Sequence, residues 1–369
     1  MTTTIRRIAI NTGGGDAPGL NAVIHGAVYA ARGLGWEVVG IRDGFDGILT
    51  PERYPHGGVI ELNRTRVREI AHLGGTILGT TNRGNPFHRL IEQPDGSKKE
   101  TDVSGMILEY FEDHKIDALI SVGGDGSLTI AHELHKKGLR VIGVPKTIDN
   151  DLESTTVTFG FNSAVSFATD CLDRLHSTAR SHERIMVVEV MGRYVGWIAL
   201  HSGIAGRADA ILIPEIPYSI EKVAAHLKKK HASGKPYSIV VVAEGAKPEG
   251  GEAIVKAREA GRAERLGGIG ETVAKQLEEL TGKESRTVVL GHLLRGGSPT
   301  ALDRFLGVGF GAGAVHGLSQ GLNGVMVALQ PPNLKFVPLG EATAKLKSVP
   351  TDGEAVLVCR ALDISLGDR

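Results

Sequence analysis

Residues 7–21 read RIAINTGGGDAPGLN: an apolar strand-like run, three glycines, a proline and the start of a helical pattern. A strand that runs through a glycine loop into a helix is typical of doubly wound α/β folds. Pro18 suits the first helical turn, because proline has no N–H to lose there. Glycines at a helix N-terminus leave backbone N–H groups uncovered, which favours anion binding. The stretch predicts a phosphate loop, with a tight structural turn as the plainer alternative.

The glycine spacing excludes two well-known phosphate loops. The stretch fits neither GxGxxG, the dinucleotide fingerprint, nor GxxxxGK[ST], the P-loop pattern. Residues 309–314, GFGAGA, weakly imitate the dinucleotide fingerprint but follow a helix-like run instead of a strand. We interpret them as close packing between helices.

Short apolar runs alternate with helical patterns along the chain. Runs rich in Val and Ile without polar alternation are typical of strands buried on both faces, so the pattern predicts an α/β fold with mostly parallel sheets. The expected strands are Arg7–Asn11, Val38–Ile41, Ala118–Val122, Val141–Val144, Ile185–Val190, Ile211–Ile213, Ile239–Ala243, Thr287–Leu290, Val325–Leu329 and Ala355–Val358. The expected helices are Leu20–Gly33, Val103–His114, Leu128–Lys137, Asn162–Thr178, Ile220–Lys230 and Ile269–Leu280.

The composition limits the possible functions. Glycine accounts for 50 of 369 residues, about twice its usual share, and 41% of residues are hydrophobic, which excludes a disordered chain. Basic and acidic residues number 42 each, so no global charge draws the chain to nucleic acid or to a membrane surface. We expect no leader segment and no membrane span. The two cysteines, Cys171 and Cys359, form no CxxC motif and fit a reducing, cytoplasmic setting.

Two segments look unrelated to catalysis. Residues 245–264 are rich in Gly, Lys and Glu, and we interpret them as a solvated segment with room for a short helix at Ala253–Ala260. The last stretch, Pro331–Arg369, is interpreted as a packing tail with a helix-like run followed by one strand.

A second glycine loop, Gly123-Gly124-Asp125-Gly126-Ser127, follows the expected strand at 118–122. Glycines let a phosphate chain lie against the backbone, and a carboxylate such as Asp125 can bind Mg²⁺ directly or through water. A structural turn with Asp125 as a helix cap is the alternative.

A third loop, Pro145–Asp151 (PKTIDND), follows the expected strand at 141–144. Asp and Asn are ordinary turn residues. A turn does not need a lysine beside two carboxylates, however, whereas phosphoryl transfer needs a cation for charge and a carboxylate for the acceptor proton. We therefore interpret the loop as catalytic.

Basic side chains flank two further strands. Arginine forks match phosphate geometry and histidine adds a donor, although a single arginine is usually solvated surface. The residues are Arg184 and Arg193 around the strand at 185–190, and Arg286, His292 and Arg295 around the strand at 287–290.

Five motifs, in their order along the chain, resemble the 6-phosphofructokinase family from about residue 5 to residue 345. They are GGGDAPG (13–19), GGDGS (123–127), PKTIDND (145–151), MGR (191–193) and HLLRGGSP (292–299). The resemblance implies two doubly wound domains with the active site in the cleft between them. Residues 1–160 with 294–344 would bind the donor, and residues 161–293 with 345–369 the sugar phosphate. It also implies Mg²⁺ as cofactor, ATP and fructose 6-phosphate as substrates, and a homodimer or homotetramer with shared active sites.

The resemblance also assigns roles to residues. Asp149 looks like the general base, Arg193 and Lys146 look like groups that neutralise the transferring phosphoryl, and Asp125 resembles the residue serving Mg²⁺. The donor contacts it implies are Gly15, Arg83, Gly124, Gly126 and Ser127. The sugar contacts it implies are Thr147, Ile148, Asp149, Met191, Gly192, Arg193 and Glu244, and it counts Thr147 among the catalytic residues as well. The 6-phosphate clamp it implies consists of Arg184, Arg286, His292 and Arg295, with Arg184 and Arg286 supplied by a neighbouring subunit.

The chain departs from the common bacterial ATP enzymes of the family at three places. The stretch at 75–83, which contains Arg83, is slightly longer. His25 and Tyr29 stand where those enzymes carry effector-binding arginines. The stretch after Glu244 is also longer.

Positions 126 and 146 indicate which phosphoryl donor, ATP or pyrophosphate, the chain uses. Pyrophosphate-using relatives carry Asp where this chain has Gly126, and Lys where it has Lys146, whereas common ATP enzymes carry Gly at both. The chain thus resembles a mixed-substrate subgroup. A carboxylate at position 126 would repel an α-phosphate by about 4 kcal/mol at ~4 Å and intermediate dielectric, and Gly126 removes that repulsion. We therefore expect ATP, with pyrophosphate as the alternative.

Two rival functions remain at this stage. One is another GGDG kinase acting on NAD or a lipid, which the motifs at 191–193 and 292–297 disfavour. The other is a sensor that binds nucleotide or sugar phosphate without turnover, which the joint presence of Asp125, Asp149 and Arg193 disfavours.

Overall fold

The computed structural model describes residues 5–257 and 265–369 and divides the chain into two compact units. Unit 1 comprises Met1–Thr147, Leu152–Gly160 and Arg295–Leu346. Unit 2 comprises Ile148–Asp151, Phe161–Leu294 and Lys347–Arg369. Each unit is therefore assembled from separate pieces of the sequence.

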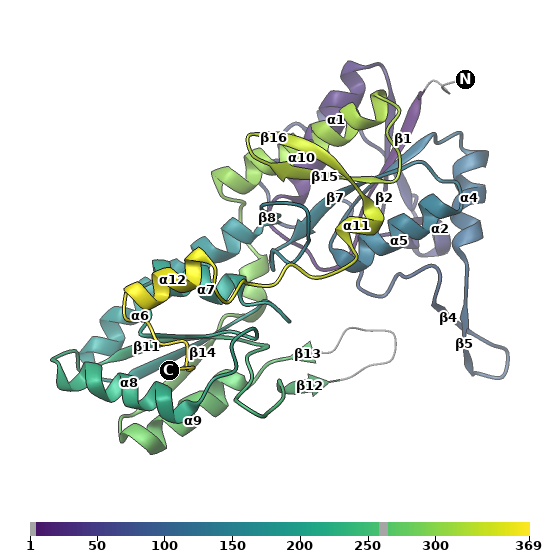
Figure 1. Cartoon of the computed structure of the whole chain (residues 1–369). Helices are drawn as coiled ribbons and strands as arrows, with labels where there is room; N and C mark the ends of the chain where they lie inside the picture. Colours follow the sequence, from purple (N-terminus) through teal and green to yellow (C-terminus); the bar gives the residue numbers. More distant parts are fainter. Residues whose placement is uncertain (1–4, 258–264) are drawn as a thin grey trace. The chain divides into compact units, whose positions relative to one another are not determined.

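Unit 1 is built on an eight-stranded sheet in the order β16-β15-β7-β6-β1-β2-β3, with β8 paired to β7. The inner strands are parallel, and only β3 and β16 run antiparallel to their neighbours. The strands are β1 Arg7–Thr12, β2 Glu37–Ile41, β3 Val59–Glu61, β6 Ala118–Gly123, β7 Val141–Thr147, β8 Phe159–Gly160, β15 Val325–Gln330 and β16 Asn333–Pro338. A separate hairpin, β4 Arg89–Glu92 and β5 Lys98–Thr101, extends away from this sheet (Figure 1).

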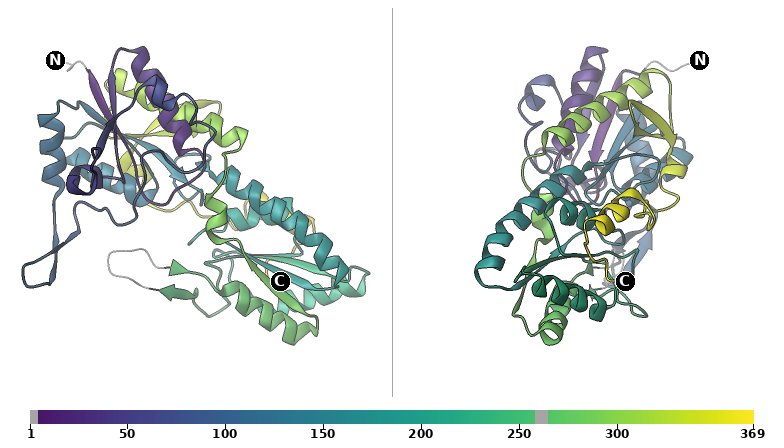
Figure 2. Two further views of the ribbon diagram at one scale, coloured as in Figure 1. Left: turned by 180° about the vertical axis from the view of Figure 1, so that it is seen from behind. Right: turned by 60° about the vertical axis from the view of Figure 1, so that its left-hand side comes forward.

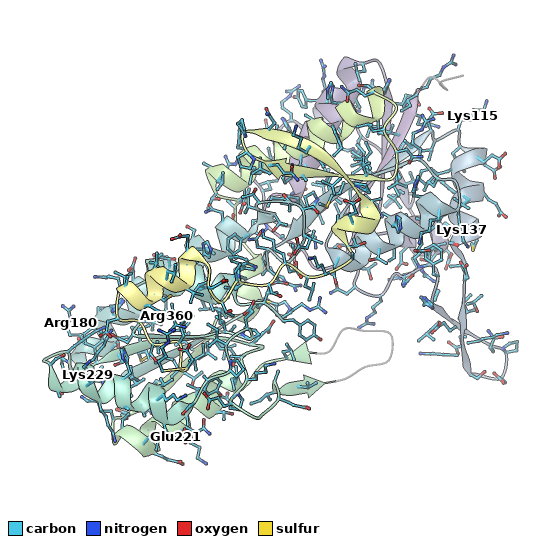
Figure 3. The ribbon with its side chains drawn as sticks, viewed as in Figure 1. Lys115, Lys137, Arg180, Glu221, Lys229 and Arg360 are labelled. Atoms are coloured by element: carbon cyan, nitrogen blue, oxygen red, sulfur yellow. The ribbon has the colours of Figure 1, made fainter. Side chains whose placement is uncertain are left out.

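Helices cover both faces of this sheet (Figure 2). Along β1 the side chains alternate, so Ile8 and Ile10 join the core under α1 and α10, while Ala9 joins the core under α4 and α5. At the end of α5, Lys137 (Figure 3) donates to Asp102 Oδ2 at 2.8 Å, beside the start of α4. The helices are α1 Leu20–Gly33, α2 Asp46–Leu49, η1 Pro51–Arg53, α3 Arg64–Val67, α4 Ser104–Asp113, α5 Asp125–Lys136, α10 Ala301–Ser319 and α11 Leu339–Ala342.

The GFGAGA run lies inside α10, where it packs on α1. A Cβ on Gly311 would overlap the Val23 carbonyl oxygen and lie 2.8 Å from the Ala27 nitrogen. Gly311 therefore lets the two helix backbones approach each other, which confirms the packing interpretation at this glycine, whereas a Cβ on Gly309 would meet no atom within 4 Å.

Unit 2 is built on an entirely parallel four-stranded sheet in the order β10-β11-β9-β14. Its strands are β9 Ile185–Val190, β10 Ala210–Leu212, β11 Ser238–Ala243 and β14 Ser285–Val289, and a small hairpin pairs β12 Val255–Ala257 with β13 Arg265–Leu266. Its helices are α6 Phe161–Ser181, α7 Trp197–Ala205, α8 Ile220–Ala232, α9 Ile269–Thr281 and α12 Glu354–Ala361, with η2 Gly291–Arg295 at the boundary with unit 1.

The structure confirms nine of the ten expected strands and all six expected helices to within a few residues, but it corrects the tail. Ala355–Val358 was expected to be a strand and is part of α12, and the strand of the tail, β16, comes first. The short helix expected at Ala253–Ala260 is replaced over residues 255–257 by β12, and residues 258–260 lie outside the described residues. Among the residues described, no helix combines the length and apolar character needed to cross a bilayer.

Candidate active site

The first glycine loop joins β1 to α1 at the carboxyl end of the unit 1 sheet. Gly13 donates its N–H to the Val122 oxygen at 2.9 Å, and Gly14 donates to the Thr81 oxygen at 3.1 Å. Two of the three amides expected to face an anion are therefore used within the fold. Within the part of the chain that the structure describes, the Gly15 N–H has no partner, so the expected cradle of three amides reduces to Gly15.

The second loop packs directly against the first. Gly124 caps α5, and Asp125 is the first residue of that helix. A Cβ on Gly13 would lie 2.6 Å from the Ser127 hydroxyl, so the two loops can touch only because glycine stands there. Gly126 is exposed, and a Cβ there would meet no atom within 4 Å. The helix N-terminus thus faces open space beside Asp125.

Lys146 brings a cation into the first loop. It lies in β7, its residue is only 5% exposed, and its ammonium group donates to the Gly15 carbonyl oxygen. The next residue, Thr147, ends β7 and is also buried. A buried ammonium beside a free amide is an arrangement suited to an anionic ligand.

Two threonines that the motifs did not single out hold the first loop in place. The Thr80 hydroxyl donates to the Gly14 carbonyl oxygen at 2.6 Å, while the Thr81 oxygen accepts the Gly14 N–H. The Thr81 hydroxyl accepts the N–H of Arg83 at 3.1 Å, and Arg83 itself is exposed. The only signal in the sequence was their position just before Arg83.

Arg295 lies with the donor loops of unit 1. A Cβ on Gly15 would overlap its guanidinium group, so the two are in close contact. Its expected partners in the phosphate clamp, Arg184, Arg286 and His292, belong to unit 2.

Asp149 and Ile148 begin unit 2 and are nearly inaccessible, at 5% and 3% exposed. The next residue, Asn150, has a φ of 55°, which is unusual for a residue other than glycine. The chain therefore bends immediately after the buried Asp149, two residues beyond the end of β7.

Strands β9 and β11 bring a second cluster together. After β9, Gly192 has a φ of 146° and Arg193 a φ of 51°, so the chain turns sharply behind Met191. The Arg193 N–H donates to the Glu244 carboxylate at 3.1 Å, and Glu244 directly follows β11. Met191, Gly192, Arg193 and Glu244 therefore meet at the carboxyl end of the unit 2 sheet, as expected for a ligand site.

Arg184 and Arg286 lie at the opposite end of the same sheet. Arg184 directly precedes β9, and Arg286 is the second residue of β14. Both arginines pair with the carboxylate of Glu284, and the Arg184 Nε lies 2.5 Å from Glu284 Oε2. The Arg184 hydrogen bond lowers the pKa of Glu284 below its ordinary value. At about 3.3 Å per residue, the length of β9 separates Arg184 from Met191 by roughly 20 Å. His292, exposed on η2, follows β14.

The surroundings of Asp125 fit the way in which proteins hold Mg²⁺ beside a phosphate ligand. Mg²⁺ prefers one or two carboxylates together with substrate phosphates to a cage made of protein side chains. Asp125 supplies a carboxylate beside the open space at Gly126. Within the described ranges, no group of three or more His, Cys, Asp or Glu side chains could hold a metal alone.

A family model described as Phosphofructokinase matches residues 7–318. The chain is 50% identical over 369 residues to an "ATP-dependent 6-phosphofructokinase" of Chloroflexus aurantiacus, with both chains covered completely. It is 47% identical over 350 residues to a "Pyrophosphate--fructose 6-phosphate 1-phosphotransferase" of Amycolatopsis methanolica, covering 94% of this chain and 97% of the other. A solved phosphofructokinase of Pichia pastoris matches with a TM-score of 0.78 and 30% identity, over 99% of this chain and 37% of that one.

Proposed function

The chain belongs to the phosphofructokinase family, and from that premise we propose that it is an ATP-dependent 6-phosphofructokinase of glycolysis. It transfers the γ-phosphoryl of ATP to the 1-hydroxyl of fructose 6-phosphate, giving fructose 1,6-bisphosphate and ADP. The relatives support this activity over a sensor that binds without turnover and over a kinase for NAD or a lipid.

Asp149 is the general base of the proposed mechanism. It takes the proton of the 1-hydroxyl while that oxygen bonds to the γ-phosphorus and the bond to ADP breaks. Burial of the residue supports this role, because a carboxylate shielded from water interacts strongly with the acceptor proton. Lys146 and Arg193 neutralise charge on the phosphoryl oxygens, and Thr147 and Ile148 line the acceptor site.

The donor phosphates lie along the two glycine loops of unit 1. Their contacts are the Gly15 N–H, the Gly124–Ser127 helix start and the Arg83 side chain, and the free Gly15 amide is what favours this assignment. Asp125 holds Mg²⁺, which supplies charge neutralisation to the donor when it is bound.

The open space at Gly126 is the observation that favours ATP over pyrophosphate as the donor. An ATP donor has an α-phosphate and a nucleoside beyond its two reacting phosphates, and they need room that a larger side chain would occupy. Because a Cβ at Gly126 has no neighbour within 4 Å, that room exists. Relatives 50% and 45% identical that are named as ATP-dependent agree with this choice.

Pyrophosphate is the second candidate donor. Lys146 is the residue that pyrophosphate-using relatives carry at its position, and two Amycolatopsis relatives with that named activity are 47% and 48% identical. Lys146 does not exclude ATP, since a cation beside the transferring group assists either donor.

The proposed sugar-phosphate contacts are Met191, Gly192, Glu244 and the clamp residues Arg184, Arg286 and His292, which all belong to unit 2, together with Arg295, which belongs to unit 1. Because Arg184 and Arg286 lie about a strand length from Met191, they serve the site of a neighbouring subunit. The enzyme is therefore a homodimer or homotetramer. Unit 1 is the donor domain and unit 2 the sugar-phosphate domain, and the two free cysteines suit a cytoplasmic enzyme.

A coupled assay with fructose 6-phosphate tests the proposal. ADP formation is followed with ATP and phosphate formation with pyrophosphate, each with Mg²⁺ and then with a chelator. We expect turnover with ATP that the chelator abolishes. Turnover with pyrophosphate and none with ATP would move the enzyme to the second candidate, and none with either donor would refute the proposed function.

A further inference from the structure

Lys347, in the C-terminal tail, makes three contacts with the two elements that carry Asp149 and Arg193. Its N–H donates to the Asp151 carbonyl oxygen at 2.9 Å, and its ammonium group donates to the Asn150 side-chain oxygen at 3.2 Å. Its own carbonyl oxygen accepts the indole N–H of Trp197 at 2.7 Å. All of these residues belong to unit 2.

The same side chain also covers the Trp197 ring. The Lys347 ammonium lies 5.5 Å from the centroid of the indole, a cation–π distance. Trp197 is the first residue of α7, four positions after Arg193, so its indole is fixed to the turn that carries that arginine. Lys347 is thus bonded to the Asp149 loop on one side and to the start of α7 on the other.

A second link secures the tail two residues later. Glu215 accepts the N–H of Gly196 at 3.0 Å and the N–H of Val349 at 2.9 Å on the same carboxylate oxygen. Gly196 caps α7. The tail is therefore fastened to the start of α7 at Lys347 and again at Val349.

We propose that Lys347 is a positioning residue for the reaction, which joins the loop of the base Asp149 to the turn of Arg193 through Trp197. The inference rests on the proposed function for the roles of Asp149 and Arg193. It uses a residue beyond the stretch matched by the family model, which ends at residue 318.

The physical reason is geometric. A base and a charge-neutralising arginine must hold a productive arrangement to within a fraction of an ångström, and small misplacements cost large factors in rate. Asn150 and Asp151 are 4% and 5% exposed, so a bond to them acts on a closely packed loop. Lysine suits the position because its stem covers the indole while its ammonium reaches the amide oxygen.

The test compares Lys347→Met with Lys345→Met. Methionine keeps the length and apolar character of the stem but removes the charge and the donor to Asn150. Lys345 is an exposed lysine two residues earlier and is the matched control. We expect Lys347→Met to lower kcat about tenfold or more with both KM values within threefold of wild type. Lys347→Arg, which keeps a charged donor, should restore most of kcat, and Lys345→Met should match wild type.

Amide hydrogen exchange measures, without any substrate, whether Lys347 stabilises the loop that contains Asp149. Exchange at residues 148–152 should be faster in Lys347→Met and unchanged in Lys345→Met. Should Lys347→Met prove unfolded by thermal denaturation, Trp197→Leu removes both the ring under the Lys347 ammonium and the indole N–H bond to the Lys347 carbonyl oxygen, and kcat should fall about tenfold with both KM values within threefold of wild type.

Wild-type kcat and wild-type exchange at 148–152 in the folded Lys347→Met protein would overturn the proposal. So would an equal loss in Lys345→Met. An inactive wild-type enzyme would instead refute the proposed function, while the exchange comparison would still report whether the link exists.

Discussion

Asp149 concentrates the proposed chemistry in one carboxylate. Asp149→Asn keeps the shape of the side chain and removes its capacity to take a proton, so we expect kcat to fall by about 10² or more. The KM for fructose 6-phosphate should stay within a few-fold of wild type, because the asparagine still fits the site. Steady-state kinetics measure both values. The control is Asp352→Asn on an exposed loop, and a near-wild-type rate for Asp149→Asn would remove Asp149 from the role.

Gly126 carries the donor prediction. Gly126→Asp places a carboxylate in the open space at the start of α5, where it repels an α-phosphate by about 4 kcal/mol at ~4 Å and intermediate dielectric. We expect the KM for ATP to rise at least tenfold, with a smaller effect on any turnover with pyrophosphate. Gly105→Asp, at an exposed glycine of α4 with equally open surroundings, is the control. Unchanged ATP kinetics in Gly126→Asp would contradict the argument from space.

The residues of the site show what motifs can and cannot predict. The glycine loops follow β1 and β6, and the buried lysine lies near the end of β7, as the sequence predicts. This was predictable because the composition of a loop and the strand that precedes it are local properties of the sequence. Which acceptor each backbone N–H bonds to, however, depends on residues distant in the sequence. Gly13 and Gly14 donate their N–H groups to Val122 and Thr81, residues far away in the sequence, so three glycines in a row could not reveal that these two amides are used within the fold.

At the scale of elements, a buried carboxylate ties a helix to a sheet. Glu189 lies within β9, is 3% exposed, and accepts the N–H groups of Gly268 and Gly270 at the start of α9. Glu189→Gln loses the charge that these donors and the helix dipole stabilise, which costs about 1–3 kcal/mol. Chemical denaturation should show this loss. Glu279→Gln, on the exposed side of α9, should leave stability unchanged, and equal stability of both variants would contradict the expected role of Glu189.

The contact between α1 and α10 offers a matched pair of glycines. Gly311→Ala forces a methyl group onto the backbone of α1 and should destabilise the protein by about 1–3 kcal/mol. Gly309→Ala, on the same helix, meets no atom within 4 Å and should stabilise it by up to about 1 kcal/mol. Denaturant unfolding of the two variants should therefore shift in opposite directions. A shift of the same sign and size would show that helix propensity, not packing, governs both positions.

Elements with uniform apolar runs were predictable from the sequence, and the tail was not. The run at 355–358 is apolar and partly β-branched. Over so short a length, such a run occurs both in strands and in buried helix segments, so it does not distinguish them. Only the structure shows Val356 and Cys359 buried with Leu357 and Val358 exposed between them, the three-residue spacing of a helix face. β16 has the opposite pattern: Leu334 and Phe336 alternate with polar residues, but Pro331 and Pro332 directly precede this strand, and prolines argue against a strand.

At the scale of the whole molecule, the two arginines paired with Glu284 predict complementation between subunits. Each proposed site uses its own His292 and the Arg286 of a neighbouring subunit. In an oligomer that mixes Arg286→Ala and His292→Ala subunits, the site of an Arg286→Ala subunit keeps its own His292 and receives an intact Arg286 from a His292→Ala neighbour. We expect each variant to be nearly inactive alone and a refolded equimolar mixture to recover about a quarter of wild-type activity, as random dimers require. The double variant Arg286→Ala/His292→Ala mixed with itself is the control. No recovery on mixing would mean that each clamp is built within one chain.

The interleaving of the two units along the chain matters for how the protein is made. A ribosome synthesises α1 long before the helix that covers it, because α10 begins only at Ala301, and β15 and β16 at the edge of the same sheet follow later still. Unit 2 is likewise incomplete until its last residues, which include Lys347, have emerged. Nascent chains must therefore carry exposed apolar surface until the later segments of each unit have been synthesised, and a chain cut before residue 295 cannot complete either unit.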